Sequence, residues 1–184
     1  MRRALRVHAD CDRGPVVRIE ADIRRRGPRT LALVYELTGR MDALRIPPPA
    51  PPARTDGLWR RTCFEAFLGL DDRQGYLEFN LSPSGNWAAY GFTGQRTGMA
   101  PLEEAAAPKI DVARTATDLT LTAALQIPEL PGLPGDAPWR LGLAAVIEDA
   151  DGRISYWALA HPPGKPDFHH PDGLACEVRA PEDA

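Results

Sequence analysis

Residues 62–90 decide the fold, in the two runs Thr62-Cys63-Phe64-Glu65-Ala66-Phe67-Leu68 and Tyr76-Leu77-Glu78-Phe79-Asn80-Leu81-Ser82-Pro83-Ser84-Gly85-Asn86-Trp87-Ala88-Ala89-Tyr90. Side chains on a strand point alternately to its two faces, and both runs alternate with that period. In the second run, one face carries Leu77, Phe79 and Leu81, and the other carries Tyr76, Glu78 and Asn80. The stretch therefore predicts neighbouring antiparallel strands that have one apolar and one mixed face.

The register of these strands follows from the same alternation, because a slip of one residue would turn every apolar side chain to the wrong face. Keeping the apolar faces together pairs Phe64 with Leu81 and Glu65 with Asn80. Residues 82–85 have the composition of a four-residue hairpin loop. The analogous register beyond that loop sets Trp87 beside Asn80, and Ala89 beside Glu78. It sends Ala88 and Tyr90 to the core side.

Strand patterns of the same kind recur along the chain, separated by Gly, Pro, Asn and Asp turns. The further candidates are Val16–Ile23, Leu31–Leu37, Lys109–Arg114, Leu119–Ile127, Trp139–Glu148, Ile154–Leu159 and Leu174–Val178. Helix-favouring composition is limited to Leu102–Ala107, which neighbouring prolines confine to a turn or two. The pattern predicts an all-β fold, a two-sheet antiparallel β-sandwich of jelly-roll or immunoglobulin-like type.

Length and composition place the chain among ordinary globular proteins. At 184 residues with 43% hydrophobic content, we expect a single domain over residues 1–184 and no membrane-spanning segment. The net charge of −3 argues against a nucleic-acid partner. The first residues lack the apolar run of a secretion signal, so we expect a cytoplasmic protein with reduced cysteines. A Cys11–Cys176 bridge stays open as an alternative.

The mixed face of the predicted strands is the best candidate for a binding site. It would carry Glu65, Phe67, Tyr76, Glu78, Asn80 and Trp87, above a floor lowered by Ala89 and Gly91. Aromatic rings can stack on the C–H face of a sugar while carboxylates and an amide bind its hydroxyls. The alternative is a face covered by loops, in which Glu65 and Glu78 pair with arginines such as Arg96.

Histidines gather near the end of the chain, between His161 and His170. With Asp167 and Asp172 nearby, His161 and His169 are candidate ligands of a metal ion. The spacing matches no specific metal motif, and we favour the interpretation in which these residues hydrogen-bond an ordered loop. No nucleophile elbow or phosphate-binding loop is present. We therefore favour a non-catalytic binding domain over an enzyme or metalloprotein, and leave a protein partner open.

Three stretches resemble the bacterial DOMON-like domains: Leu58–Leu68, Tyr76–Tyr90, and Ser155–His161 together with Pro166–His169. The resemblance implies a β-sandwich related to the family 9 carbohydrate-binding modules and to cytochrome domains that hold haem. For the sugar binders it implies an aromatic clamp formed by Trp87 with Trp59 or Trp157. For the haem binders it implies a Met and a His on the iron, here Met99 and His161. Both groups of relatives are typically exported, whereas we expect no secretion signal from the first residues here.

Overall fold

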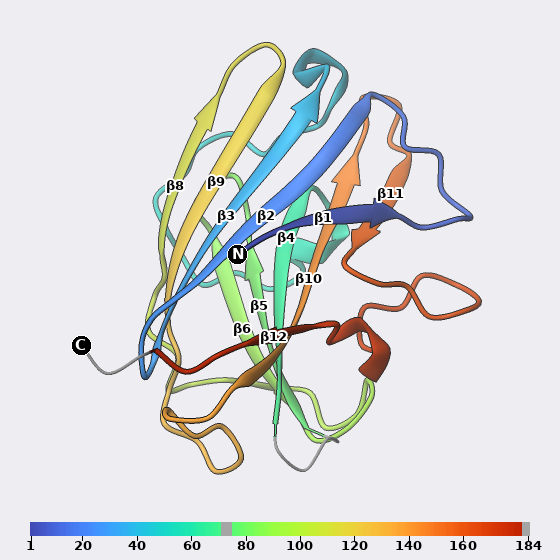
Figure 1. Ribbon diagram of the computed structural model, residues 1–184. Helices are drawn as coiled ribbons and strands as arrows, with labels where there is room; N and C mark the ends of the chain where they lie inside the picture. The colour runs from blue at the N-terminus through green and yellow to red at the C-terminus, as the bar shows by residue number, and fades with distance from the viewer. Residues whose placement is uncertain (71–74, 182–184) are drawn as a thin grey trace.

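Antiparallel strands dominate the computed structural model, which describes residues 1–70 and 75–181 (Figure 1). The strands are β1 (Arg2–Val7), β2 (Val16–Gly27), β3 (Thr30–Gly39), β4 (Cys63–Gly69), β5 (Tyr76–Leu81), β6 (Trp87–Phe92), β7 (Ala100–Pro101), β8 (Lys109–Arg114), β9 (Asp118–Gln126), β10 (Trp139–Glu148), β11 (Ile154–Ala158) and β12 (Cys176–Val178). The described residues contain no α-helix, only the 3₁₀ turns η1 (Met41–Ala43), η2 (Leu58–Arg60) and η3 (Pro171–Gly173). The predicted all-β class is confirmed, whereas β1 and β7 were not predicted.

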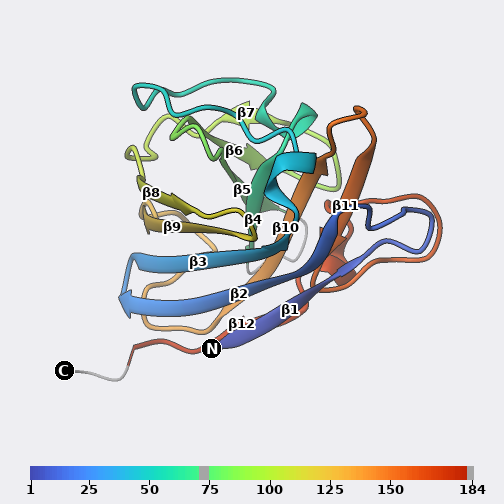
Figure 2. The same ribbon diagram turned by 90° about the horizontal axis from the view of Figure 1, so that it is seen from above.

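The strands form one curled sheet that folds into two layers (Figure 2). The first layer has the order β8, β9, β3, β2, β1, and the second has β7, β6, β5, β4, β10, β11. Strand β1 joins them, because Arg2–Leu5 pairs with β2 whereas Arg6 and Val7 pair with β11. The short strand β12 pairs antiparallel with the beginning of β10 and lies outside the two strand orders above. The layers face each other as in a β-sandwich, which confirms the predicted architecture.

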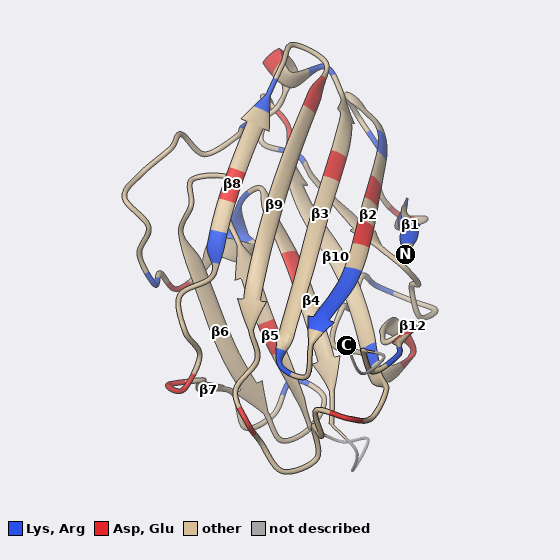
Figure 3. Ribbon diagram, turned by 60° about the vertical axis from the view of Figure 1, so that its left-hand side comes forward, with Lys and Arg blue, Asp and Glu red and all other residues tan. Residues whose placement is uncertain are grey.

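The main core fills the space between the layers. In the first layer every second residue points inward, as in β3, where Leu31, Leu33 and Leu37 are fully buried. Opposite them, the second layer contributes Phe64 and Phe79. The outward positions of the first layer are polar and carry charges of both signs, visible on β2 and β8 in Figure 3. This half-solvated alternation is the signal that made the first layer predictable.

The second layer is buried on both faces. Every residue of β4 and of β5 is buried, although their sequences alternate in polarity. Loops cover the side turned away from the main core, called the outer face here. A second apolar cluster lies there, formed by Phe67, Tyr76, Ala88, Tyr90, Phe92, Ala144 and Ala158 with the loop residues Leu58, Trp59, Phe168 and Leu174 packed against it.

The predicted register is correct for the first hairpin and wrong for the second. Phe64 pairs with Leu81 and Glu65 with Asn80, as expected. Across the next turn, Asn80 faces Ala88, not Trp87, and Glu78 faces Tyr90. Trp87 and Ala89 therefore point into the main core, and Ala88 and Tyr90 onto the outer face.

A shorter loop causes this shift by one residue. Ser82 N–H donates to the Asn86 carbonyl at 2.9 Å, so the loop is Pro83-Ser84-Gly85 and not four residues long. Gly85 has a φ of 93°, the left-handed conformation that three-residue hairpin loops require at their last position. Glycine adopts it without the steric cost of a Cβ.

Two further observations concern the chain as a whole. Cys11, Cys63 and Cys176 are unpaired, so the alternative Cys11–Cys176 bridge is not formed. Among the described residues, no helix has the length and apolar character needed to cross a bilayer.

Candidate functional site

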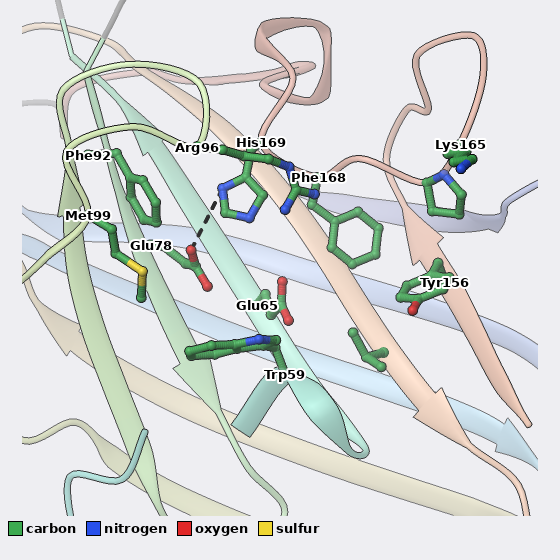
Figure 4. A pocket seen from close by; sticks show the side chains of 12 residues that line it. Trp59, Glu65, Glu78, Phe92, Arg96, Met99, Tyr156, Lys165, Phe168 and His169 are labelled. Atoms are coloured by element: carbon green, nitrogen blue, oxygen red, sulfur yellow. Dashed lines mark ion pairs between the residues drawn. The ribbon is translucent and has the colours of Figure 1, made fainter. Parts of the chain in front are cut away.

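A pocket of about 500 Å³ opens on the outer face of the second layer (Figure 4). Strands β4, β5, β6, β10 and β11 each contribute at least one side chain, and three loops close the sides. The lining residues are Trp59, Glu65, Glu78, Phe92, Arg96, Met99, Val146, Tyr156, Lys165, Pro166, Phe168 and His169. Its volume lies in the range of small-ligand sites.

Two carboxyl groups form the floor of the pocket. Glu65 on β4 and Glu78 on β5 lie side by side in Figure 4 and are only 3% and 4% exposed. Glu78 Oε1 accepts a hydrogen bond of 2.6 Å from the Asn80 amide, whose Oδ1 in turn lies 3.7 Å from the Cys63 sulfur. Burial raises the pKa of Glu78, against the opposing effects of the Asn80 hydrogen bond and of Arg96.

Glu65 has no such support. Its Oε1 is buried, and no hydrogen-bond donor among the described residues reaches it. Burial, and secondarily the neighbouring Glu78, raise the pKa of the Glu65 carboxyl well above its ordinary value. Buried polar groups are nearly always paired in proteins, so this oxygen is an acceptor that a bound molecule could satisfy.

His169 forms one side of the pocket above the floor. The Tyr76 hydroxyl accepts from the backbone N–H of Arg96 at 3.3 Å and is hydrogen-bonded to His169 Nδ1 at 2.7 Å. Burial, and then the charge of Arg96, lower the pKa of His169 to about 4. The imidazole is therefore neutral near pH 7, and its 3.9 Å approach to Glu78 Oε2 is no ion pair there.

Arg96 pairs with Asp167 at the rim of the pocket, and its charge still lowers the pKa of Glu65 and of Glu78. Its Nε donates to Asp167 Oδ1 at 3.0 Å, while Gln95 Nε2 donates to Oδ2 at 2.7 Å. Arg96 has a φ of 53°, an uncommon left-handed conformation for a residue with a side chain. The Asp167 carboxylate also accepts from the His169 backbone N–H at 3.1 Å, so one carboxylate joins both loops of the rim.

Aromatic rings flank the carboxyls on two sides. In Figure 4 the Trp59 indole lies on one side of Glu65, and the rings of Phe168 and His169 lie on the other. Trp59 packs against Tyr90 at 5.7 Å between ring centres, and the Tyr90 hydroxyl donates to Asp56 at 2.6 Å. Phe168 contacts Tyr156 at 5.9 Å. The indole is thus positioned by its own neighbours.

The structure brings together only part of the predicted binding face. Glu65, Glu78 and Arg96 line the pocket, whereas Tyr76 and Asn80 lie behind it and hold His169 and Glu78 in place. The expected pairing of Arg96 with Glu65 or Glu78 is replaced by its pairing with Asp167.

The two other tryptophans predicted for the site lie in the main core. Trp87 is 6% exposed, with the Arg54 guanidinium 4.6 Å above its ring. Trp157 is 2% exposed, and its indole N–H donates to Ser155 at 3.0 Å. Their placement on the binding face was wrong because both belong to the inward-pointing set of their strands. Trp59, which the family resemblance named as an alternative, supplies the indole instead.

Sequence reasoning missed Phe92, Tyr156, Lys165 and Phe168 as pocket residues. Tyr156 and Phe92 lie on strands, and correct face assignment would have found them. Lys165 and Phe168 lie in a loop without periodicity, where no local signal predicts which way a side chain points.

The residues proposed for metal or haem do not fit such a group. His161 Nε2 lies 2.8 Å from the Arg6 carbonyl, and the ring is not part of the pocket lining to which Met99 belongs. His169 is engaged with Tyr76. Among the described residues, no three His, Cys, Asp or Glu side chains are grouped to hold a metal ion.

Similarity to other proteins is confined to structure. No family model and no curated protein matches the sequence. A "putative carbohydrate-binding protein" from Bacteroides uniformis superposes with a TM-score of 0.63 at 16% identity, over 94% of this chain and 83% of that one.

Family 9 carbohydrate-binding modules from Caldicellulosiruptor kristjanssonii have the same fold. A complex with glucose aligns with all of this chain and 85% of the module, at a TM-score of 0.66 and 9% identity. A complex with cellotriose covers 89% and 74%, with a TM-score of 0.61 and 9% identity. At these identities the likeness establishes the fold, which agrees with the sandwich that the sequence resemblance implied.

Proposed function

We propose that the protein is a non-catalytic domain that binds a saccharide in the outer-face pocket. The observation that supports this most is the flanking of two buried carboxyls by the Trp59 indole and the Phe168 ring. A pyranose presents an apolar C–H face to such rings and a belt of hydroxyls to acceptors between them. A sugar hydroxyl can donate to the unpaired Glu65 oxygen.

The fold supports the same proposal. Three structural neighbours are described by their names as carbohydrate-binding, two of them in complex with glucose or cellotriose. The pocket volume of about 500 Å³ suits one or two sugar rings better than a long chain.

Isothermal titration calorimetry of a panel of mono- and disaccharides against the full chain tests the proposal. We expect at least one sugar to bind, Trp59→Ala to abolish that binding, and Trp59→Phe to retain part of it. Trp157→Phe is the matched control, because this indole is buried in the main core. The Trp157→Phe variant should bind the sugar with the affinity of the wild type.

Two outcomes would contradict the proposal. The first is a panel in which no sugar binds to protein that unfolds cooperatively. The second is a bound sugar whose affinity Trp59→Ala leaves unchanged, since the ligand would then occupy another surface. Product analysis after long incubation should show the bound sugar intact, and its cleavage would overturn the non-catalytic part.

A further inference from the structure

The pocket floor holds two acidic side chains that have no paired cation in the described part of the chain. Neither Glu65 nor Glu78 forms an ion pair with any Lys or Arg among the described residues. Both are more than nine-tenths buried, and they belong to neighbouring strands. Burying two like-charged groups without a cation is costly, because each destabilises the ionised form of the other.

The surrounding groups do not remove that imbalance. Arg96 lowers the pKa of both carboxyls through its charge, but its guanidinium pairs with Asp167 and forms no ion pair with either of them. The lowered pKa of His169 keeps the imidazole neutral near pH 7. Lys165 is exposed at the rim. Tyr35 and Cys63 near Glu65 are buried, and burial raises the pKa of each, so they stay neutral too. Tyr156 also lines the pocket, and its side chain carries no cation.

We infer that the ligand is an amino sugar, whose ammonium group lies on the floor and donates to the unpaired Oε1 of Glu65. The inference rests on the proposed function and names the substrate class of that site. An ammonium offers three donors, enough for Glu65 and Glu78 together. The adjacent Trp59 face also attracts a cation, by cation–π interaction that strengthens when water is excluded.

Binding of this kind moves a proton but makes no covalent bond. Because burial and the neighbouring Glu78 raise the pKa of Glu65, the free pocket holds a proton on this carboxyl more readily than an exposed glutamate does. An arriving ammonium replaces that proton, which leaves to the buffer. A neutral sugar leaves it in place, so the two ligand classes differ in proton release as well as in affinity.

Calorimetry with glucose, glucosamine and its positional isomers, and N-acetylglucosamine tests the inference on the full chain. We expect at least one aminodeoxy sugar to bind at least about tenfold more tightly than glucose, as a charge-assisted hydrogen bond allows. Titrations in two buffers of different ionisation enthalpy should show proton release for that sugar and not for glucose. N-acetylglucosamine, in which the nitrogen is uncharged, should lose the preference.

Glu65→Gln is the decisive variant, because it keeps the size of the side chain and removes its charge. It should bring the amino sugar down to the affinity of glucose and abolish proton release, while glucose binding persists. Glu78→Gln provides a second measurement in case Glu65→Gln does not fold. It should reduce the preference for the amino sugar over glucose.

The outcomes separate this inference from the proposed function. Equal affinity for glucose and all the aminodeoxy sugars, or a preference that survives both substitutions, overturns the inference and leaves saccharide binding intact. Absence of binding by every sugar overturns both. Tighter binding of N-acetylglucosamine than of any free amine would also contradict it, because the floor would then favour a neutral group.

Discussion

The hydroxyl of Tyr76 lies 2.7 Å from Nδ1 of His169, and this contact joins strand β5 to the loop that closes one side of the pocket. Tyr76 accepts from the Arg96 backbone at the same time, so three chain segments meet at one oxygen. The imidazole in this contact is neutral near pH 7, because burial and the charge of Arg96 lower the pKa of His169 to about 4. Protonation of His169 would place a charge in a buried position near Arg96, which makes the rim sensitive to acid.

His169 should make the folded protein less stable as the solution becomes acidic. Its pKa is lowered from 6.5 to about 4, so the unfolded chain binds the proton more readily than the folded protein. The resulting stability is complete above about pH 6.5 and is lost as the pH falls towards 4. Urea unfolding from pH 7 to pH 4 should show the wild type losing up to about 3 kcal/mol relative to His169→Gln. A constant difference between the two proteins would contradict this.

Glu65 should have the opposite pH dependence. Its pKa is raised above 4.5, so its contribution is present at acidic pH and is lost as the pH rises through the folded-state pKa. Glu65→Gln removes this loss. Its free energy of unfolding should match the wild type near pH 4 and exceed it by about 1–3 kcal/mol at pH 8, the usual cost of an unsatisfied buried group. A variant less stable than the wild type at pH 8 would indicate an unrecognised cation beside Glu65.

The two tryptophans on opposite faces of the second layer should differ in stability effect. Trp87→Ala opens a cavity in the main core and should cost about 3–5 kcal/mol. Trp59→Ala removes a half-buried ring from a loop turn, and we expect a loss of about 1 kcal/mol. Chemical denaturation of both variants measures this directly. Equal losses would mean that Trp59 is a structural residue as much as Trp87.

Phe79 should contribute to stability as a core residue does. Its side chain is 2% exposed between the layers, and Phe79→Ala should cost about 3–5 kcal/mol. Val112→Ala on the exposed edge strand β8 is the control, because Val112 is 39% exposed. We expect that substitution to change stability by no more than about 0.5 kcal/mol. Guanidinium unfolding curves compare the two.

Thiol reactivity should rank the cysteines by their surroundings. Cys63 is completely buried, and burial raises the pKa of its thiol, so the native protein should not react there. Cys176 is 3% exposed, while Cys11 is partly accessible. Alkylation of native protein followed by mass spectrometry should modify Cys11 first, and unfolding should expose all three. Fewer than three reactive thiols after denaturation would reveal a disulfide.

The strands and the first register could be read from the sequence because their causes are local. Alternation with period two reports which residues share a face, and a slip between β4 and β5 would bury the wrong side chains. Glu65 and Glu78 were therefore placed on one face correctly. The second register was wrong by one residue, since a loop of three or four residues fits Ser82–Gly85 equally well. The left-handed preference of Gly85 was the available signal for the shorter loop.

The pocket itself depends on the tertiary structure. Trp59, Phe168 and His169 lie in irregular segments, whose side-chain directions no periodicity determines, and they meet only because both loops fold over the outer face. The same covering turned Glu65 and Glu78 from half-exposed strand residues into buried carboxyls. The sequence by itself determined the strands and the face on which the acids lie. The contacts between distant segments decided what covers that face, because burial is a property of the packed chain and not of any one strand.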